Sequence, residues 1–131
     1  EDIIDYDMIV LPGGYGGADA MRSCNQVIDF LHQMNNQGKY ICAMCAAPIV
    51  LEKAGLLKDK KYTAYMGYDQ KIHQGTYLED KVVIDGNLVT SRGPATAYAF
   101  AYKLVELLGG AALAVKKRMV YFNAFDVKED E

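Results

Sequence analysis

Residues 39–55, KYICAMCAAPIVLEKAG, decide the fold of this chain. The segment begins with the apolar run Lys39–Ala43, which is typical of a strand covered on both faces, as in a parallel sheet. Pro48 suits the first turn of a helix, where no amide partner is lost, and Gly55 suits the position just after the end of a helix. The pattern therefore predicts that the chain turns from a strand into a helix at Cys45.

Upstream of this segment the same alternation is present. Met8–Leu11 is another short apolar run. A flexible loop is expected after it, formed by Gly13, Gly14, Gly16 and Gly17. A stripe at helical spacing then predicts a helix that contains Val27, Ile28, Leu31 and Met34. We expect Asn25 to cap this helix and Gly38 to end it. The order strand, helix, strand, helix is typical of a parallel α/β sheet.

Downstream, residues 62–64 predict another short strand. Asp85-Gly86-Asn87 separates two apolar runs, and Asp-Gly favours a tight hairpin turn. A helix is expected from Ala97 to Leu108 and a shorter one over Ala111–Arg118. The fold class predicted is α/β, with a mostly parallel sheet plus a β-hairpin, in a single domain over residues 1–131. Residues 126–131 are acidic and are expected to fray.

Composition excludes several functional classes. The chain has 131 residues, of which 51% are apolar and 24% charged, which suits one compact domain. The net charge is −3, so there is no basic excess for binding nucleic acid. The apolar runs are far shorter than the roughly 20 residues that cross a bilayer.

Three cysteines, an odd number, argue against a secreted disulfide framework and favour a reducing cytoplasm. Because the chain opens on acidic residues without a methionine and almost directly on a strand, we expect an upstream part to be absent.

Cys45 is the best chemical candidate in the sequence. A residue at this turn stands at the carboxyl edge of the sheet, where open α/β sheets bind ligands. Unpaired amides at the start of a helix stabilise the thiolate, which is the reactive nucleophile. The amide of Ala46 and the amides of Gly13 and Gly14 could complete an oxyanion hole. The alternative interpretation is a small buried core thiol beside an ordinary tight turn.

The other two cysteines have structural interpretations. Cys42 and Cys45 form a Cys-x-x-Cys pair, but three residues of strand span about 10 Å. A disulfide needs Cα atoms within about 7 Å, so Cys42 is assigned to the core, with a redox pair with Cys45 as the alternative. Cys24 precedes a helix and is interpreted as a surface or packing thiol.

Few residues are available as partners for the thiol. His73 is a candidate general base, with a surface loop histidine as the alternative, and His32 is expected to be solvated. Arg92 could bind an anionic ligand or oxidised sulfur, or form a structural salt bridge. No metal is predicted, because no His/Cys/carboxylate cluster has ligand spacing. No cofactor is predicted either, since the loop at Gly14 lacks the phosphate-binding and dinucleotide patterns.

Three stretches resemble signatures of the DJ-1/ThiJ/PfpI superfamily. They are residues 7–14, residues 43–48 and residues 90–96, and the similarity continues through residues 83–87, 99–101 and 106–110. Order and spacing both fit, over nearly the whole chain. The chain is most similar to the bacterial DJ-1-like, YajL/ThiJ-type branch.

The resemblance implies a flavodoxin-like three-layer sandwich, a homodimer, and Cys45 as an oxidation-prone nucleophile at a strained elbow. Gly13, Gly14 and Ala46 would supply the amides of the oxyanion hole. Members of the superfamily are described as redox-responsive chaperones, as glyoxalases or deglycases, and, in other branches, as proteases or amidases. The implied function is therefore a response to oxidative stress or action on a small reactive carbonyl or oxidant. The alternatives are a cysteine-dependent hydrolase with His73 as base, and a non-enzymatic chaperone that Cys45 switches.

Two departures limit what carries over. The protease-like branch has a histidine directly after the cysteine, where this chain has Ala46. The glutamate that hydrogen-bonds the reactive cysteine in the family comes from an opening β-α unit, upstream of Glu1 in this numbering. We expect that unit to be supplied as a separate segment, by a partner, or by an exchanged element, because its loss would expose a sheet edge.

Overall fold

The computed structural model describes residues 6–124. The chain divides after Ala97 into two compact units, which are treated separately below. The single domain predicted over 1–131 stays a prediction, and the acidic end at 126–131 lies outside the described residues.

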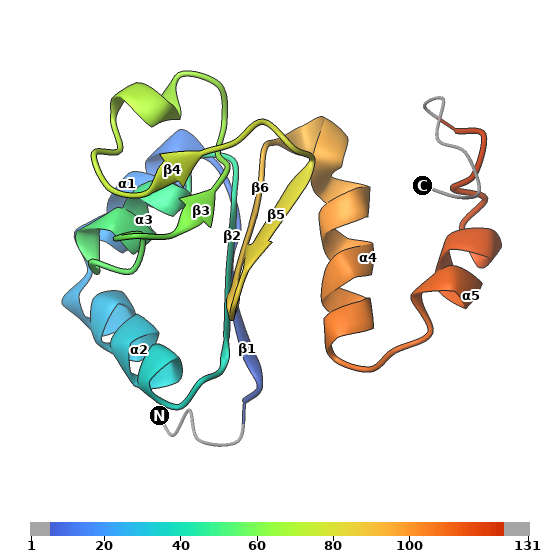
Figure 1. Cartoon of the computed structure of the whole chain (residues 1–131), viewed down its shortest axis with the longest axis horizontal. Helices are drawn as coiled ribbons and strands as arrows, with labels where there is room; N and C mark the ends of the chain where they lie inside the picture. Colours follow the sequence, from blue (N-terminus) through green and yellow to red (C-terminus); the bar gives the residue numbers. More distant parts are fainter. Residues whose placement is uncertain (1–5, 125–131) are drawn as a thin grey trace. The chain divides into compact units, whose positions relative to one another are not determined.

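Four strands of the first unit form one mixed sheet, with the order β1-β2-β6-β5 (Figure 1). Strands β1 (Met8–Leu11), β2 (Tyr40–Met44) and β6 (Leu88–Ser91) run parallel, and β5 (Val82–Asp85) pairs antiparallel with β6. The mostly parallel sheet with a hairpin is thus confirmed. In the hairpin turn, Gly86 has a φ of 61°, which glycine adopts without strain.

The parallel register brings three strand ends to one edge of the sheet. Leu11 in β1 lies beside Ala43 in β2, and Met44 in β2 lies beside Ser91 in β6. The segments that leave these strands therefore begin next to one another. This edge is where Gly13, Cys45 and Arg92 are placed.

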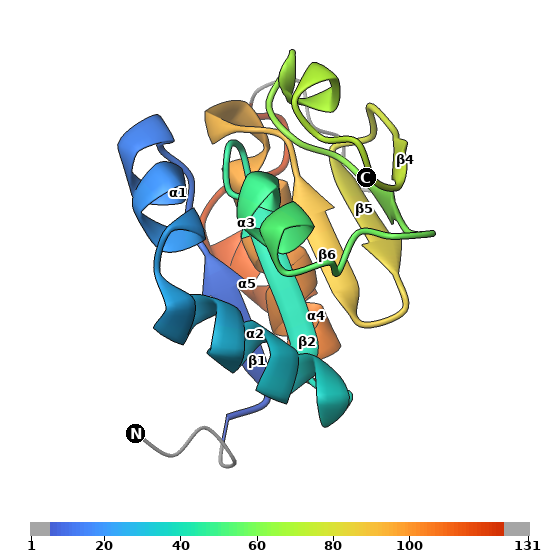
Figure 2. The same ribbon diagram turned by 90° about the vertical axis from the view of Figure 1, so that its left-hand side faces the viewer.

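Helices α2 (Asn25–Asn36) and α3 (Pro48–Lys53) pack against β2, and α1 (Tyr15–Arg22) packs against both of them (Figure 2). Gly38 follows the end of α2, as predicted, and its amide donates a hydrogen bond to the Asn35 carbonyl (3.0 Å). Asn25 is not the cap that was expected: it is the first helical residue, and the extended Cys24 holds the N-cap position. The Cys24 carbonyl accepts the Ile28 amide at 3.2 Å, so the helix starts one residue earlier than the side-chain preference indicated.

The expectation of a flexible glycine loop after β1 is wrong in part. Gly16 and Gly17 belong to α1, although glycine disfavours a helix by about 1 kcal/mol relative to alanine. The Ala18 amide donates to the Gly14 carbonyl at 2.9 Å, and the Ala18 side chain is fully buried. Packing of α1 against the neighbouring helices outweighs the low local propensity.

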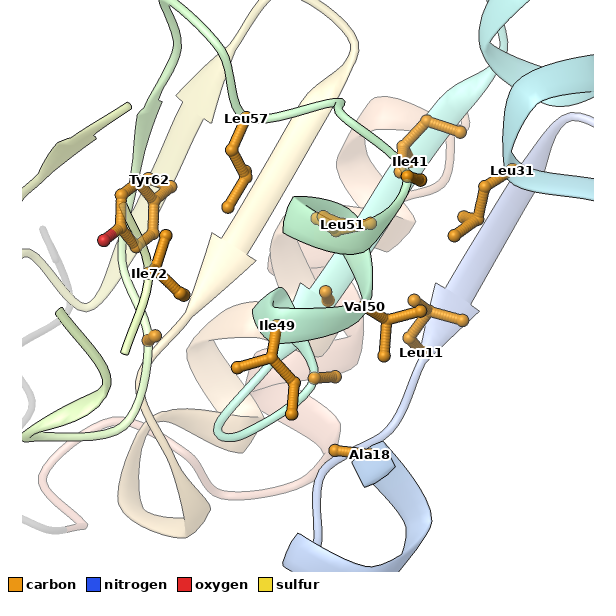
Figure 3. Close-up of a cluster of buried hydrophobic side chains, with 14 of the residues drawn as sticks. Leu11, Ala18, Leu31, Ile41, Ile49, Val50, Leu51, Leu57, Tyr62 and Ile72 are labelled. Atoms are coloured by element: carbon orange, nitrogen blue, oxygen red, sulfur yellow. The ribbon is translucent and has the colours of Figure 1, made fainter. Parts of the chain in front are cut away.

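The hydrophobic core of this unit lies between the sheet and these helices (Figure 3). It joins residues from β1, α2 and β2 to the apolar face of α3. Its large, fully buried members include Leu31, Ile41, Val50, Leu51, Leu57 and Tyr62. The core therefore fixes the two segments that flank Cys45, namely β2 before it and α3 after it.

Residues 61–96 add smaller elements. Strands β3 (Lys61–Tyr62) and β4 (Thr76–Tyr77) form a two-stranded sheet, and short 3-10 turns cover Tyr68–Gln70 and Pro94–Thr96. The strand predicted over 62–64 is thus shorter and begins one residue earlier. Beyond it, the Thr63 amide donates to the buried Thr90 hydroxyl at 2.9 Å, which ties the segment to β6.

The second unit contains most of α4 (Ala97–Leu107) and all of α5 (Ala112–Arg118), close to the predicted bounds. Tyr102 and Tyr121 pack edge to face, with ring centroids 4.8 Å apart. The Tyr102 hydroxyl donates to the Met119 sulfur at 3.2 Å. Within residues 6–124, no helix is long and apolar enough to cross a membrane.

Candidate functional site

Cys45 lies in the turn that joins β2 to α3, as the sequence predicted. Its backbone has a φ of 60°, a conformation that costs a non-glycine residue on the order of 1–3 kcal/mol. Two hydrogen bonds hold the residue there. The Cys45 amide donates to the Ser91 carbonyl (3.0 Å), and the Cys45 carbonyl accepts the Tyr65 amide (2.8 Å). The residue is half-buried, whereas Cys42 three residues earlier is fully buried.

The glycine loop after β1 meets this turn. A β-carbon on Gly13 would lie 2.7 Å from the Cys45 β-carbon and 3.4 Å from its sulfur, so a side chain at position 13 would clash. Gly14 follows, with a φ of 101°, at the N-cap of α1. The structure thus brings Gly13 into contact with Cys45, as the parallel order of β1 and β2 requires.

Three backbone amides in the segments next to Cys45 have no hydrogen-bond acceptor in the described part of the chain. Among residues 6–124, the amides of Gly13, Gly14 and Ala46 donate to no acceptor. The Ala46 side chain is fully buried, so its backbone is fixed by the core. Preorganised amides of this kind can stabilise an oxygen that becomes negative during a reaction.

Three tyrosines beside Cys45 form a cluster that the sequence analysis missed. The rings of Tyr15 and Tyr68 stack with centroids 6.1 Å apart, and Tyr65 meets both edge to face, at 6.1 and 6.4 Å. We call these three residues the tyrosine cluster. Tyr15 is about 50 residues away in sequence from Tyr65 and Tyr68, so no local pattern indicates that the three rings meet.

The hydroxyls of Tyr15 and Tyr68 hold their protons more tightly than free tyrosine. Reduced hydration raises the pKa of Tyr15 above its ordinary value, and the Tyr65 hydroxyl and the charge on Cys45 act in the same direction. Reduced hydration likewise raises the pKa of Tyr68, with Tyr15 adding to the effect. Neutral phenols next to a thiol can donate hydrogen bonds without adding charge.

Arg92 leaves the end of β6 beside a cavity of about 230 Å³. Its Nη2 lies 3.8 Å from the exposed Glu79 carboxylate, a separation at which a surface ion pair contributes little. Its Nε is buried and has no partner in the described part of the chain. The Thr96 hydroxyl accepts the amides of Arg92 and Gly93 at 3.2 and 3.1 Å, which shapes the turn. Both interpretations of Arg92 are therefore consistent with the structure. The guanidinium forms a weak salt bridge with Glu79, and its Nε, free within residues 6–124, is a donor that an anion could accept from.

His73 is placed apart from the start of α3. It is exposed, and its backbone amide donates to the Glu52 carboxylate in the last turn of that helix. Cys45 precedes the first turn of the same helix. Within residues 6–124 no hydrogen bond joins the His73 ring to Cys45, so its role as base stays a prediction. His32 is exposed as expected, and its Nε2 lies 2.6 Å from the Ala54 carbonyl oxygen, to which its N–H can donate.

The other cysteines take the places predicted for them. Cys42 is fully buried in β2, and burial raises the pKa of its thiol to about 12. Cys24, Cys42 and Cys45 are all free thiols. Cys45 is thus the one cysteine that combines partial exposure with a position at the sheet edge. No group of three or more metal-ligating side chains is found between residues 6 and 124.

Comparisons with known proteins agree with this arrangement. The family model described as "DJ-1/PfpI family" matches residues 2–107. Protein dj-1beta of Drosophila melanogaster is 47% identical over 107 residues, which cover 80% of this chain and 57% of that protein. Its crystal structure superimposes with a TM-score of 0.85 at 43% identity, covering 89% of this chain and 65% of that one.

Two further relatives have names that describe an activity. Deglycase PfpI of Pyrococcus furiosus is 36% identical over 106 residues, which cover 79% of this chain and 63% of that protein. The glutathione-independent glyoxalase DJR-1.2 of Caenorhabditis elegans is 37% identical over 106 residues, covering 80% and 56%. The chain therefore spans between 56% and 63% of the length of these relatives. The cysteine turn, the flanking glycines and the extent of the match agree: the chain belongs to the DJ-1/PfpI family.

Proposed function

We propose that Cys45 is the reactive centre of a DJ-1-like protein that acts on small reactive carbonyl compounds or responds to oxidants. The observation that carries the proposal is a half-buried cysteine on a strained turn, in contact with Gly13 and followed by Ala46, two residues whose amides have no acceptor within residues 6–124. That arrangement suits a nucleophile whose product carries a negative oxygen.

The chemistry follows from these groups. The Cys45 thiolate adds to an aldehyde carbon, a carbon–sulfur bond forms, and the carbonyl electron pair moves to the oxygen. The amides of Gly13 and Ala46 stabilise the resulting oxyanion. With a peroxide, the thiolate attacks one oxygen, the oxygen–oxygen bond breaks, and hydroxide leaves, which gives a sulfenic acid. Both reactions need the same accessible Cys45 thiolate.

Two relatives support the carbonyl reaction, since their names describe a deglycase and a glyoxalase. The hydrolase alternative, with His73 as base, lacks a comparable observation. The chaperone alternative needs Cys45 only as a switch. A Cys45→Ser variant that still suppresses aggregation, without carbonyl turnover in the parent protein, would favour the chaperone.

We also propose a cytoplasmic homodimer, and an additional strand against the open edge of β1. Within the described residues β1 pairs on one side only, with β2. An open edge presents unpaired backbone N–H and C=O groups, which native sheets usually cover. Sedimentation of the 131-residue chain tests this: a well-behaved monomer would contradict it.

The carbonyl proposal is tested by following methylglyoxal consumption by the parent chain, Cys45→Ser and the matched control Cys24→Ser. We expect Cys45→Ser to fall to the background rate and Cys24→Ser to keep the parent rate. In parallel, peptide mass spectrometry after dilute peroxide should find Cys45 oxidised before Cys24 and Cys42. Equal oxidation of all three cysteines would refute a specially reactive Cys45.

A further inference from the structure

We infer that the tyrosine cluster selects carbonyl substrates that carry an aromatic ring. The inference rests on the proposed function, because it concerns the substrate class of the Cys45 site. It starts from three rings that lie together beside the one half-buried thiol at the sheet edge.

The cluster is tied to Cys45 through several contacts. The Tyr65 amide donates to the Cys45 carbonyl, so the Tyr65 backbone is fixed against the turn. Tyr15 lies two residues after Gly13, which contacts Cys45. Both Tyr15 and Tyr68 are close enough for the charge on Cys45 to affect their ionisation. A substrate held at the sulfur is therefore within reach of these rings.

Two members of the tyrosine cluster, Tyr65 and Tyr68, are packed against neighbouring residues, and the third, Tyr15, is exposed. Tyr68 is only 5% exposed, and the Lys71 ammonium lies 4.6 Å from its ring centroid. The Tyr65 ring packs on Gly93, where an added β-carbon would lie 3.4 Å from the ring. Tyr15 is 60% exposed although it stacks on Tyr68. Its remaining surface is thus open to a ligand, while its position is held by the two rings behind it.

An aromatic ligand gains more from this surface than a small aliphatic one. Offset-stacked and edge-to-face rings attract one another beyond the effect of buried area. A two- or three-carbon carbonyl compound has no ring that could stack on Tyr15. We therefore expect a phenyl-bearing compound to react at Cys45 about 3- to 10-fold faster than its intrinsic reactivity predicts. This factor corresponds to the interaction free energy of one pair of aromatic rings.

The test compares two alkylating agents on the full chain, iodoacetamide and its N-phenyl derivative iodoacetanilide. Each forms a carbon–sulfur bond with the thiolate while the carbon–iodine bond breaks and iodide leaves. Peptide mass spectrometry gives the rate at Cys45 and, as an internal reference, at Cys24. At each cysteine, the alkylation rate with iodoacetanilide is divided by the rate with iodoacetamide. The measured quantity is this rate ratio at Cys45 divided by the rate ratio at Cys24.

Three variants separate the ring from other effects. Tyr15→Leu removes the exposed ring, Tyr15→Phe keeps the ring without the hydroxyl, and Tyr6→Leu removes a ring that is 53% exposed just before β1. We expect the ratio to fall about 3- to 10-fold in Tyr15→Leu and to stay at the parent value in the other two. An unchanged ratio in Tyr15→Leu would overturn the inference.

A second arm separates this inference from the proposed function. Phenylglyoxal and methylglyoxal are offered to the parent chain and to Tyr15→Leu. If both are consumed and Tyr15→Leu slows them equally, the aromatic preference is wrong while the carbonyl activity stands. If neither is consumed but the alkylation ratio still falls in Tyr15→Leu, the carbonyl activity is wrong, and the cluster remains an aromatic-binding surface beside Cys45.

Discussion

Gly13 and Cys45 are packed so closely that a β-carbon on Gly13 would lie 2.7 Å from the Cys45 β-carbon. The two residues come from neighbouring parallel strands, at the points where β1 and β2 end. The Cys45 turn and the glycine loop are thus packed directly against each other.

This contact predicts the effect of a single methyl group. Gly13→Ala should displace the Cys45 turn, lower the free energy of unfolding by about 1–3 kcal/mol, and slow Cys45 chemistry about tenfold or more. Gly16→Ala is the matched control, because an added β-carbon there meets nothing within 4 Å and favours helix α1. Urea unfolding and the Cys45 alkylation rate are the measurements. A Gly13→Ala protein as stable and reactive as the parent would contradict the described packing.

The burial of Cys42 predicts how stability depends on pH. Burial raises its pKa to about 12 from 9.0, so the folded state keeps the thiol protonated after the unfolded chain has begun to ionise. The resulting stabilisation is fully present below pH 9 and declines as pH rises from 9 toward 12. We expect urea unfolding under reducing conditions to show this decline, and the decline to be smaller in Cys42→Ala. Parallel curves for the two proteins would argue against a buried thiol.

The position of His73 predicts a small effect of its side chain on carbonyl turnover. Its contact with Glu52 is made by the backbone amide, so His73→Ala keeps that contact and removes only the ring. We expect methylglyoxal consumption to stay within about twofold of the parent, since a positioned general base contributes at least about 100-fold. Ester hydrolysis measured on the same variant tests the alternative. A large loss of ester hydrolysis in His73→Ala would support His73 as the general base. Unchanged ester hydrolysis would exclude the hydrolase mechanism with His73 as base.

Several elements were predictable because their signals are local. Pro48 begins α3, Gly38 follows α2, and Gly86 sits in the β5–β6 turn, each at a position where backbone geometry limits the residue. Helix α1 was missed, since Gly16 and Gly17 carry no helical signal and the helix depends on packing of Ala18. Asn25 was assigned as a cap from its side chain, but the chain enters the helix at Cys24.

By itself, the sequence determined the alternation of strands and helices and the position of one cysteine at the turn between β2 and α3. Apolar runs and helix-end residues act over a few neighbours, so they can be recognised without a structure. Only the tertiary structure decided what surrounds Cys45. The contact with Gly13 depends on strand pairing. The ring contacts among Tyr15, Tyr65 and Tyr68 join segments about 50 residues apart, which only the folded core brings together.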